Sequence, residues 1–348
     1  MPKVSVIIPI YNVAKYIERC AESLFSQTLD DIEYIFIDDC TPDNSIYILN
    51  SVLDKYPHRR DSVRIMKMPV NSRQAAVRKY GMLIATGDYI IHCDSDDWVD
   101  VDLYEKMYSE AINSDADVVV CPIVDEYETY SLRRKFRVYP DTGKQLVEKW
   151  YNSTFGMFLW NKLVRRKIFI DNEILPYDGI NLWEDNGLML RAFYYVGKIS
   201  SISTSAYHYN QFNPNTITKQ YGRSEIDQMI NCAKLVGDFY STKYDADRYQ
   251  LSINALKYLA KLNLVTTRFD WLKELLFNGR EQMILTDYFR SEKDITWDFA
   301  KQCGVEHGVI RLPETNDFDI TDLSHWKSVY KRFSDFGIKP LIIEPMPN

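Results

Sequence analysis

Short apolar runs alternate with stretches of helical spacing in the N-terminal third of the chain. Residues 3–10 form a continuous apolar run rich in β-branched side chains, which is typical of a strand buried on both faces. In residues 14–27 the apolar positions recur at helical spacing, and residues 32–37 form a second buried run. A strand, a helix and a strand in this order predict a right-handed βαβ unit.

The same alternation continues further along the chain and predicts an α/β fold with a mostly parallel sheet. Helices are expected over residues 43–53, 74–85 and 186–195, with another beginning near Asp102, and strands over residues 63–68, 89–93 and 117–124. A polar, aromatic, hairpin-like segment follows at residues 126–139. Beyond Arg223 the pattern is mostly helical.

Polar side chains follow the predicted strands at the points where the strands end. Tyr11 comes after the first strand, Asp38 and Asp39 after the second, and Asp94 and Asp96 after the fourth. Open α/β sheets bind ligands beyond the carboxyl ends of their strands. We therefore expect these groups to converge on one crevice.

The densest of these clusters is Asp94-Ser95-Asp96-Asp97. Three carboxylates within four residues repel one another, and a divalent cation bound by hard oxygen ligands would keep them ionised together. The alternative is a solvated acidic turn that caps the helix starting near Asp102, because Asp and Ser are favoured at turns and N-caps.

Several function classes are excluded or made less favourable by what the sequence lacks. A Rossmann dehydrogenase would carry G-x-G-x-x-G after its first strand, where this chain has Pro-Ile-Tyr-Asn, and a P-loop is absent as well. A net charge of −7 and a pI near 5.4 argue against nucleic acid as a partner. The basic clusters at residues 133–135 and 165–167 are interpreted as solvated faces. The six cysteines show no metal-binding spacing.

The apolar runs are too short for a signal peptide or a membrane span, so the protein is expected to be cytoplasmic. The amphipathic stretch 251–264, which carries Lys257 and Lys261, has two interpretations. It could make a peripheral contact at the inner face of the cell membrane, or it could be a helix packed on the core.

Taken together, several motifs resemble the inverting family 2 glycosyltransferases of the GT-A fold, of the bacterial polysaccharide type. They occur in the expected order and are Val-Ser-Val-Ile-Ile-Pro-Ile-Tyr-Asn (4–12), Ser-Leu-Phe-Ser-Gln-Thr (23–28), Ile-Asp-Asp-Cys-Thr-Pro-Asp-Asn-Ser (37–45), Ala-Val-Arg-Lys-Tyr-Gly (76–81), Gly-Asp-Tyr-Ile (87–90), Asp-Ser-Asp-Asp-Trp (94–98), Trp-Asn-Lys-Leu-Val (160–164) and Trp-Glu-Asp (183–185). The resemblance covers about 210 residues and leaves out the C-terminal region.

The resemblance implies a role for each matching residue. The nucleotide would be bound by Pro9, Tyr11, Asp38, Asp39, Arg78, Asp94 and Ser95, with Tyr11 stacking on the base and Asp39 accepting a hydrogen bond from a uracil imide. Asp96 would bind Mn²⁺ or Mg²⁺, and Asp185 would be the catalytic base. The acceptor would lie against Trp160, Trp183 and Glu184. The alternative is that Asp38 and Asp39 merely cap a strand end and that Arg78 pairs with Asp97.

These roles fit the chemistry of sugar transfer from a nucleotide-sugar to a saccharide or lipid-linked saccharide. A divalent metal compensates charge on the departing diphosphate, and a hydroxyl too weakly acidic to ionise needs a positioned carboxylate. The resemblance implies a nucleotide-sugar half at 1–125 and an acceptor half at 126–222, and the sequence pattern predicts a helical region at 223–348. A nucleotide-sugar-binding module without turnover is the alternative, although a pure binder would need no base. A sugar-1-phosphate nucleotidyltransferase would need a Gly-rich loop that is missing.

The chain departs from the family pattern in two places. Asn210 and Phe212 stand where the family often has basic residues that close over the diphosphate, and His208 is either a substitute metal or phosphate ligand or a structural histidine. Arg73 stands where a glycine is common in the family, so the sequence does not predict how this segment contacts the diphosphate.

Overall fold

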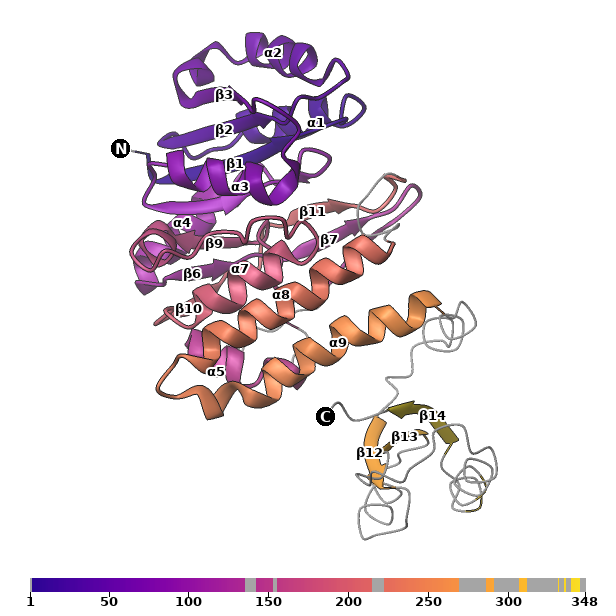
Figure 1. Cartoon of the computed structure of the whole chain (residues 1–348). Coiled ribbons are helices and arrows are strands. Elements are labelled where there is room, and N and C mark those ends of the chain that lie inside the picture. The colour runs from indigo at the N-terminus through magenta and orange to yellow at the C-terminus, as the bar shows by residue number, and fades with distance from the viewer. Residues whose placement is uncertain are drawn as a thin grey trace. The chain divides into compact units, whose positions relative to one another are not determined.

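The computed structural model describes residues 2–134, 142–152, 155–214, 222–268, 286–290, 307–311, 331, 335 and 339–344. The chain divides into two compact units, Met1–Phe269 and Asp270–Asn348. The first unit carries every residue to which the sequence assigns a function (Figure 1).

The first unit is built on a seven-stranded sheet with the strand order β10-β6-β9-β4-β1-β2-β3. All neighbouring pairs are parallel except those that β9 makes with β4 and β6. The strands are β1 Val4–Ile10, β2 Ile32–Asp38, β3 Val63–Lys67, β4 Tyr89–His92, β6 Val118–Val120, β9 Lys162–Arg165 and β10 Ile199–Ser201. The predicted mostly parallel sheet is confirmed.

Helices cover both faces of this sheet, which explains the continuous apolar runs. Successive side chains of a strand point to opposite faces. Val6 and Ile8 of β1 belong to one core cluster with α1, α2 and α4, whereas Ile7 belongs to another with α3 and α7. The bounds are α1 Ile17–Phe25, α2 Ser45–Lys55, α3 Arg73–Ile84, α4 Leu103–Ser114 and α7 Glu184–Phe193.

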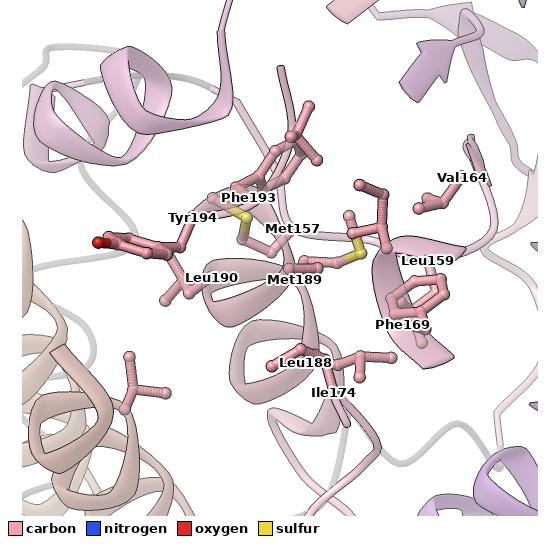
Figure 2. Packing of buried hydrophobic residues seen from close by; sticks show 14 of the residues in the cluster. Met157, Leu159, Val164, Phe169, Ile174, Leu188, Met189, Leu190, Phe193 and Tyr194 are labelled. Atoms are coloured by element: carbon pink, nitrogen blue, oxygen red, sulfur yellow. The ribbon is translucent and has the colours of Figure 1, made fainter. Parts of the chain in front are cut away.

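The larger core cluster fixes the start of α7, where the predicted base lies. Figure 2 shows Leu188, Met189 and Phe193 of α7 among side chains of residues 157–174. Burying one such side chain stabilises the fold by roughly 1.5 to 3 kcal/mol. The remaining helices of this cluster are α5 Gly143–Glu148, α6 Arg166–Ile170, α8 Arg223–Ser241 and α9 Gln250–Arg268.

Helices α8 and α9 run side by side on this core (Figure 1). Ile253, Leu256 and Ala260 of α9 are buried in the core cluster, while Leu251 and Leu259 are exposed. Packing on the core is therefore what the structure supports for the amphipathic stretch. No helix in the described part of the chain is long and apolar enough to span a bilayer.

A second, four-stranded sheet has the order β5-β11-β7-β8. Its strands are β5 Trp98–Val99, β7 Ile123–Glu126, β8 Ser131–Arg133 and β11 Tyr207–Asn210. The single strand predicted over residues 117–124 was wrong, because β6 and β7 lie in different sheets on either side of Pro122. Proline lacks the N–H that a continuous ladder requires.

Short 3₁₀ helices occupy Pro57–Ser62, Trp150–Asn152 and Ala246–Tyr249. In the second unit the structure describes a parallel three-stranded sheet of β12 Thr286–Arg290, β13 His307–Arg311 and β14 Lys339–Glu344. The helical region predicted over residues 223–348 contains α8 and α9, but for the residues of these three strands the helical prediction was wrong.

Candidate active site

The ends of β1, β2 and β4 meet at one edge of the main sheet. Ile10 is in register with Asp38, and Ile7 is in register with His92, so the residues that follow these strands leave the sheet close together. Tyr11 is 50% exposed directly after β1, which leaves its ring open to a ligand. The predicted convergence of strand ends therefore holds for the backbone.

Asp38 and Asp39 are buried and bonded to backbone N–H groups. The two carboxylate oxygens of Asp39 accept from the N–H groups of Ser72 at 2.6 Å and Arg73 at 2.9 Å, at the start of α3. Asp38 accepts from the N–H of Thr41 at 2.7 Å. Both residues thus shape the loops around the site, and an ionised carboxylate oxygen can accept a further hydrogen bond.

Three residues around this edge have left-handed backbone conformations, which cost non-glycine residues free energy. Asn12 has a φ of 55°, Cys40 of 57° and Arg73 of 65°. The value at Arg73 lies in the region that favours glycine. This explains physically why a glycine suits that position.

The acidic stretch forms a turn closed by the N–H of Asp97, which donates to the carbonyl of Asp94 at 3.0 Å. Asp97 is buried and accepts from the Tyr207 hydroxyl and from the N–H of Asn210, both at 2.7 Å. Ser95 is buried as well. Asp97 is therefore the structural member of the turn and has no contact with Arg78 that would support the alternative pairing.

Asp96 lies on the open side of the turn and is partly exposed. One carboxylate oxygen accepts from Asn213 Nδ2 at 2.7 Å. Burial of the carboxylate and the charge of Asp94 raise the pKa of Asp96 to about 6. A cation at this position would relieve both effects.

Arg78 connects the acidic turn to the start of α7. The arginine is 2% exposed; its Nη2 donates to Asp94 at 2.7 Å, and its Nε lies 3.4 Å from a Glu184 oxygen. Its Nη1 has no hydrogen-bond partner within the described residues. A single buried cation thus bridges two carboxylates that are 90 positions apart in the sequence, which brings the predicted donor side and the Glu-Asp pair together.

The Glu-Asp pair begins α7, following Trp183 in a left-handed conformation with φ 69°. Asp185 is partly exposed, and its Oδ1 accepts from the N–H of Asn186 at 2.7 Å and from Asn186 Nδ2 at 3.0 Å. Burial, and next the charge of Asp185, raise the pKa of Glu184 to about 8. Burial also raises the pKa of Asp185. Burial thus disfavours the ionised form of both carboxylates of the pair.

Lys162 is a buried cation close to this pair that the sequence did not single out. Its Nζ donates to the carbonyls of Gly156 and Phe158, each at 2.7 Å, and to Asn161 Oδ1 at 2.8 Å. Burial lowers the pKa of Lys162 to about 7, against the attraction of Asp185. Its place in the Trp-Asn-Lys motif was the feature of the sequence that could have identified Lys162 as a candidate site residue.

Two residues with predicted binding roles, Trp160 and His208, have side chains that contact other residues of the protein. Trp160 is 6% exposed and stacks on Phe158, Tyr207 and Tyr209, so little of its ring is left for an acceptor sugar. The nitrogens of His208 lie 2.6 Å from Glu126 and 3.0 Å from Asp100, and its ring stacks on Trp98.

These contacts support the structural interpretation of His208.

Trp183 is partly buried against the core, and its backbone carbonyl accepts a hydrogen bond from the Cys232 thiol.

Within the described residues no group of three or more His, Cys, Asp or Glu side chains is arranged to hold a metal ion. Mg²⁺ is commonly bound through one or two carboxylates together with substrate phosphates. Asp96, which is partly exposed and has a raised pKa, fits an ion held in this way. Asn210 at the end of β11 donates to the Asp96 carbonyl, and Asn213 just beyond this strand donates to the Asp96 carboxylate.

Residues 5–172 match the protein family described as glycosyl transferase family 2. The chain is 31% identical over 240 residues to a protein of Bacillus subtilis named uncharacterized glycosyltransferase EpsJ, covering 66% of this chain and 67% of that protein.

Two solved structures share the fold. S. aureus TarS 1–349 in complex with UDP-GlcNAc has a TM-score of 0.62 and 18% identity, with 80% of this chain and 77% of that chain covered. The mannosyltransferase PcManGT of Pyrobaculum calidifontis in complex with GDP-Man and Mn²⁺ has a TM-score of 0.50 and 12% identity, with 80% and 76% covered.

The sequence match and the shared fold agree with the motifs and the site geometry, and the chain belongs to the family 2 glycosyltransferases.

Proposed function

We propose that this glycosyltransferase moves a sugar from a UDP-sugar to a hydroxyl of a saccharide or lipid-linked saccharide, with inversion at the anomeric carbon. The observation that carries the proposal is the bridge from Asp94 through Arg78 to Glu184. It joins the turn that would face the nucleotide to the carboxylates that would face the acceptor.

The donor assignment depends on Tyr11 and Asp39. The exposed ring of Tyr11 is available for stacking on a base. Asp39 already accepts two backbone N–H groups, and its remaining lone pairs suit the imide N–H of uracil. TarS, whose structure contains UDP-GlcNAc, and PcManGT, whose structure contains GDP-Man, share this fold, so the base must be chosen by local groups such as Asp39.

Asp96, with Asp94 beside it, would hold a divalent ion at the diphosphate. One bound Mn²⁺ or Mg²⁺ supplies charge compensation for the departing diphosphate. The turn keeps Asp96 at the open side, while Asp97 fastens the turn to Tyr207 and Asn210. Asp94 remains paired with Arg78, which limits the repulsion between the two carboxylates.

Asp185 is the proposed base. Both of its hydrogen bonds in the described part of the chain go to Oδ1, so Oδ2 is available to an acceptor hydroxyl. Burial raises the pKa of Asp185, and against this effect the hydrogen bonds from Asn186 and the charges of Arg78 and Lys162 favour its ionised form. A base on the side of the sugar opposite the departing diphosphate would allow a single displacement, which inverts the anomeric carbon. The same geometric argument distinguishes inverting from retaining glycosidases.

A donor screen tests this function. The chain would be titrated with UDP- and GDP-sugars with Mn²⁺ or with EDTA, and both melting temperature and UDP release would be measured. We expect a metal-dependent stabilisation by UDP-sugars and slow hydrolysis of the one true donor. Stabilisation without any UDP release, even with acceptor extracts, would favour a binding module without turnover. Equal stabilisation by GDP-sugars would contradict the role of Asp39.

A further inference from the structure

The turn between β7 and β8 carries two tyrosines that the proposed reaction does not use. The rings of Tyr127 and Tyr130 stack with their centroids 4.5 Å apart and an angle of 17° between their planes. The N–H of Tyr127 donates to the carbonyl of Tyr130 at 2.9 Å, which closes the turn. Tyr130 is 59% exposed, and Leu132 beside it is 55% exposed. The stacked pair is therefore an apolar face held open to solvent.

An ion pair, a further hydrogen bond and two ring contacts hold the base of this hairpin. Asp125 accepts two hydrogen bonds from Arg134, both at 2.5 Å, and one from Gln211 Nε2 at 2.8 Å. The Arg134 guanidinium lies over the rings of Phe158 and Tyr209 at 5.4 and 5.7 Å. A fork between a planar cation and a carboxylate fixes orientation as well as distance. The tyrosine pair is thus preorganised before any ligand binds.

The strand register places the hairpin beside the candidate site. β7 pairs with β11 in parallel, and Asn210 is opposite Glu126 (Figure 1). Asn210 in turn donates to Asp97 and to the carbonyl of Asp96. Neighbouring strands are about 4.8 Å apart and rise about 3.3 Å per residue, so the backbone of Tyr127 lies within roughly 10 Å of Asn210.

We propose that the Tyr127–Tyr130 pair binds a sugar ring of a saccharide acceptor, one or more units away from the hydroxyl that reacts. The inference rests on the proposed function and adds an extended acceptor to it. The flat, electron-rich face of an aromatic ring packs well against the C–H groups on one face of a pyranose. Trp160, which the sequence favoured for this role, is buried, whereas Tyr130 is open.

Within the described residues of the hairpin, the charges favour a saccharide over a membrane surface. In residues 123–134, Arg134 is paired with Asp125 and Arg133 donates to the carbonyl of Ser203, while Glu126 and Glu128 add negative charge. Binding to anionic lipid would call for basic residues near the surface that are not already paired. A neutral, hydroxyl-rich ligand meets no such requirement.

The test compares Tyr130→Ala and Tyr130→Phe with wild type, with exposed Tyr47→Ala on α2 as the matched control. The probes are cellohexaose, chitohexaose, maltohexaose and mannohexaose, each with its disaccharide, titrated with UDP and Mn²⁺ present and followed by saturation-transfer NMR. We expect at least one hexaose to bind more tightly than its disaccharide. Tyr130→Ala should weaken that binding about three- to tenfold, and Tyr130→Phe and Tyr47→Ala should not.

If wild type binds no hexaose, or if Tyr130→Ala binds the hexaoses as tightly as wild type, the proposed sugar binding by the tyrosine pair is wrong. A drop in cosedimentation of Tyr130→Ala with phosphatidylglycerol vesicles, with hexaose binding unchanged, would assign the face to lipid instead. Calorimetry of UDP with Mn²⁺ on the same preparations keeps the two proposals apart. If UDP binds and the hexaoses do not, only the proposed sugar binding by the tyrosine pair is wrong. If UDP does not bind, the proposed donor is wrong.

Discussion

Two groups of carboxylates line the candidate site, and they are held in opposite ways. Those after β2 accept hydrogen bonds from the protein itself. Burial would raise the pKa of Asp43, but hydrogen bonds from Ser45, Thr41 and the N–H of Ala14 outweigh it and lower that pKa. Asp39 has a backbone N–H for each oxygen. The protein alone satisfies these groups, so they shape loops whether or not a ligand is present.

The second group consists of Asp94, Asp96, Glu184 and Asp185, and here positive charge is scarce. Arg78 pairs with Asp94 and Glu184, whereas the pKa values of Asp96 and Glu184 are raised. Stability alone does not favour buried carboxylates with too few partners. The difference indicates that the first group holds the loops of the site in place and that the second group is available to bind a cation, a proton or a substrate.

The largest effect is expected from Asp185→Asn. The variant keeps the shape of the side chain but cannot take the acceptor proton, and loss of a general base costs about 10² to 10⁴-fold in rate. Transfer rate and UDP-sugar affinity should be measured on one preparation, with Asp178→Asn, whose carboxylate is 82% exposed, as the control. Affinity should stay nearly unchanged. Near-normal turnover, or a retained anomeric configuration in the product by NMR, would refute the mechanism.

Asp96→Asn should have the next largest effect, on metal-dependent nucleotide binding. Even residues that only support a metal ligand cost about 10- to 100-fold in metal affinity when changed, and a ligand should cost at least as much. Calorimetry of UDP with and without Mn²⁺ would measure the change, and exposed Asp61→Asn serves as the control. Unchanged, metal-dependent UDP affinity in Asp96→Asn would remove Asp96 from the metal site.

Asp39→Asn should have a smaller and base-specific effect. One oxygen still accepts from a backbone N–H, but the charge that favours the uracil imide is lost. We expect UDP to lose about 1 kcal/mol, roughly fivefold in affinity, and GDP to lose nothing. The comparison is made by competition between the two nucleotides. A parallel loss for both would mean that Asp39 acts only through the loop before α3.

The sequence predicted the parts of this site that depend on local pattern. Tyr11, Asp39 and Asp96 each follow a buried apolar run, and the rule that parallel strands end at one edge of a sheet is enough to group them. The Arg78–Glu184 contact could not be predicted in this way, because no periodicity encodes a contact between α3 and α7. The burial of Trp160 likewise follows from a stack with Tyr207 of β11, a strand that sequence analysis did not predict.

The smallest effect, and the sharpest test of the comparison, is the pH dependence of stability through Glu184. Its pKa is raised from 4.5 to about 8 in the folded chain, so between these values the folded state holds a proton that the unfolded state has lost. The stability from this group is full below pH 4.5 and is lost as the pH rises through about 8. Glu184→Gln imitates the protonated form.

The variant should match wild type near pH 4.5 and be more stable than wild type at pH 8, because the wild-type carboxyl loses its proton in a buried site over this range and the glutamine amide of the variant stays neutral. Urea unfolding at fixed pH, followed by tryptophan fluorescence, measures the difference, and exposed Glu128→Gln controls for the loss of one charge. A variant less stable than wild type at pH 8 would mean that the ion pair with Arg78 outweighs burial. Glu184 would then belong with the carboxylates that the protein satisfies by itself.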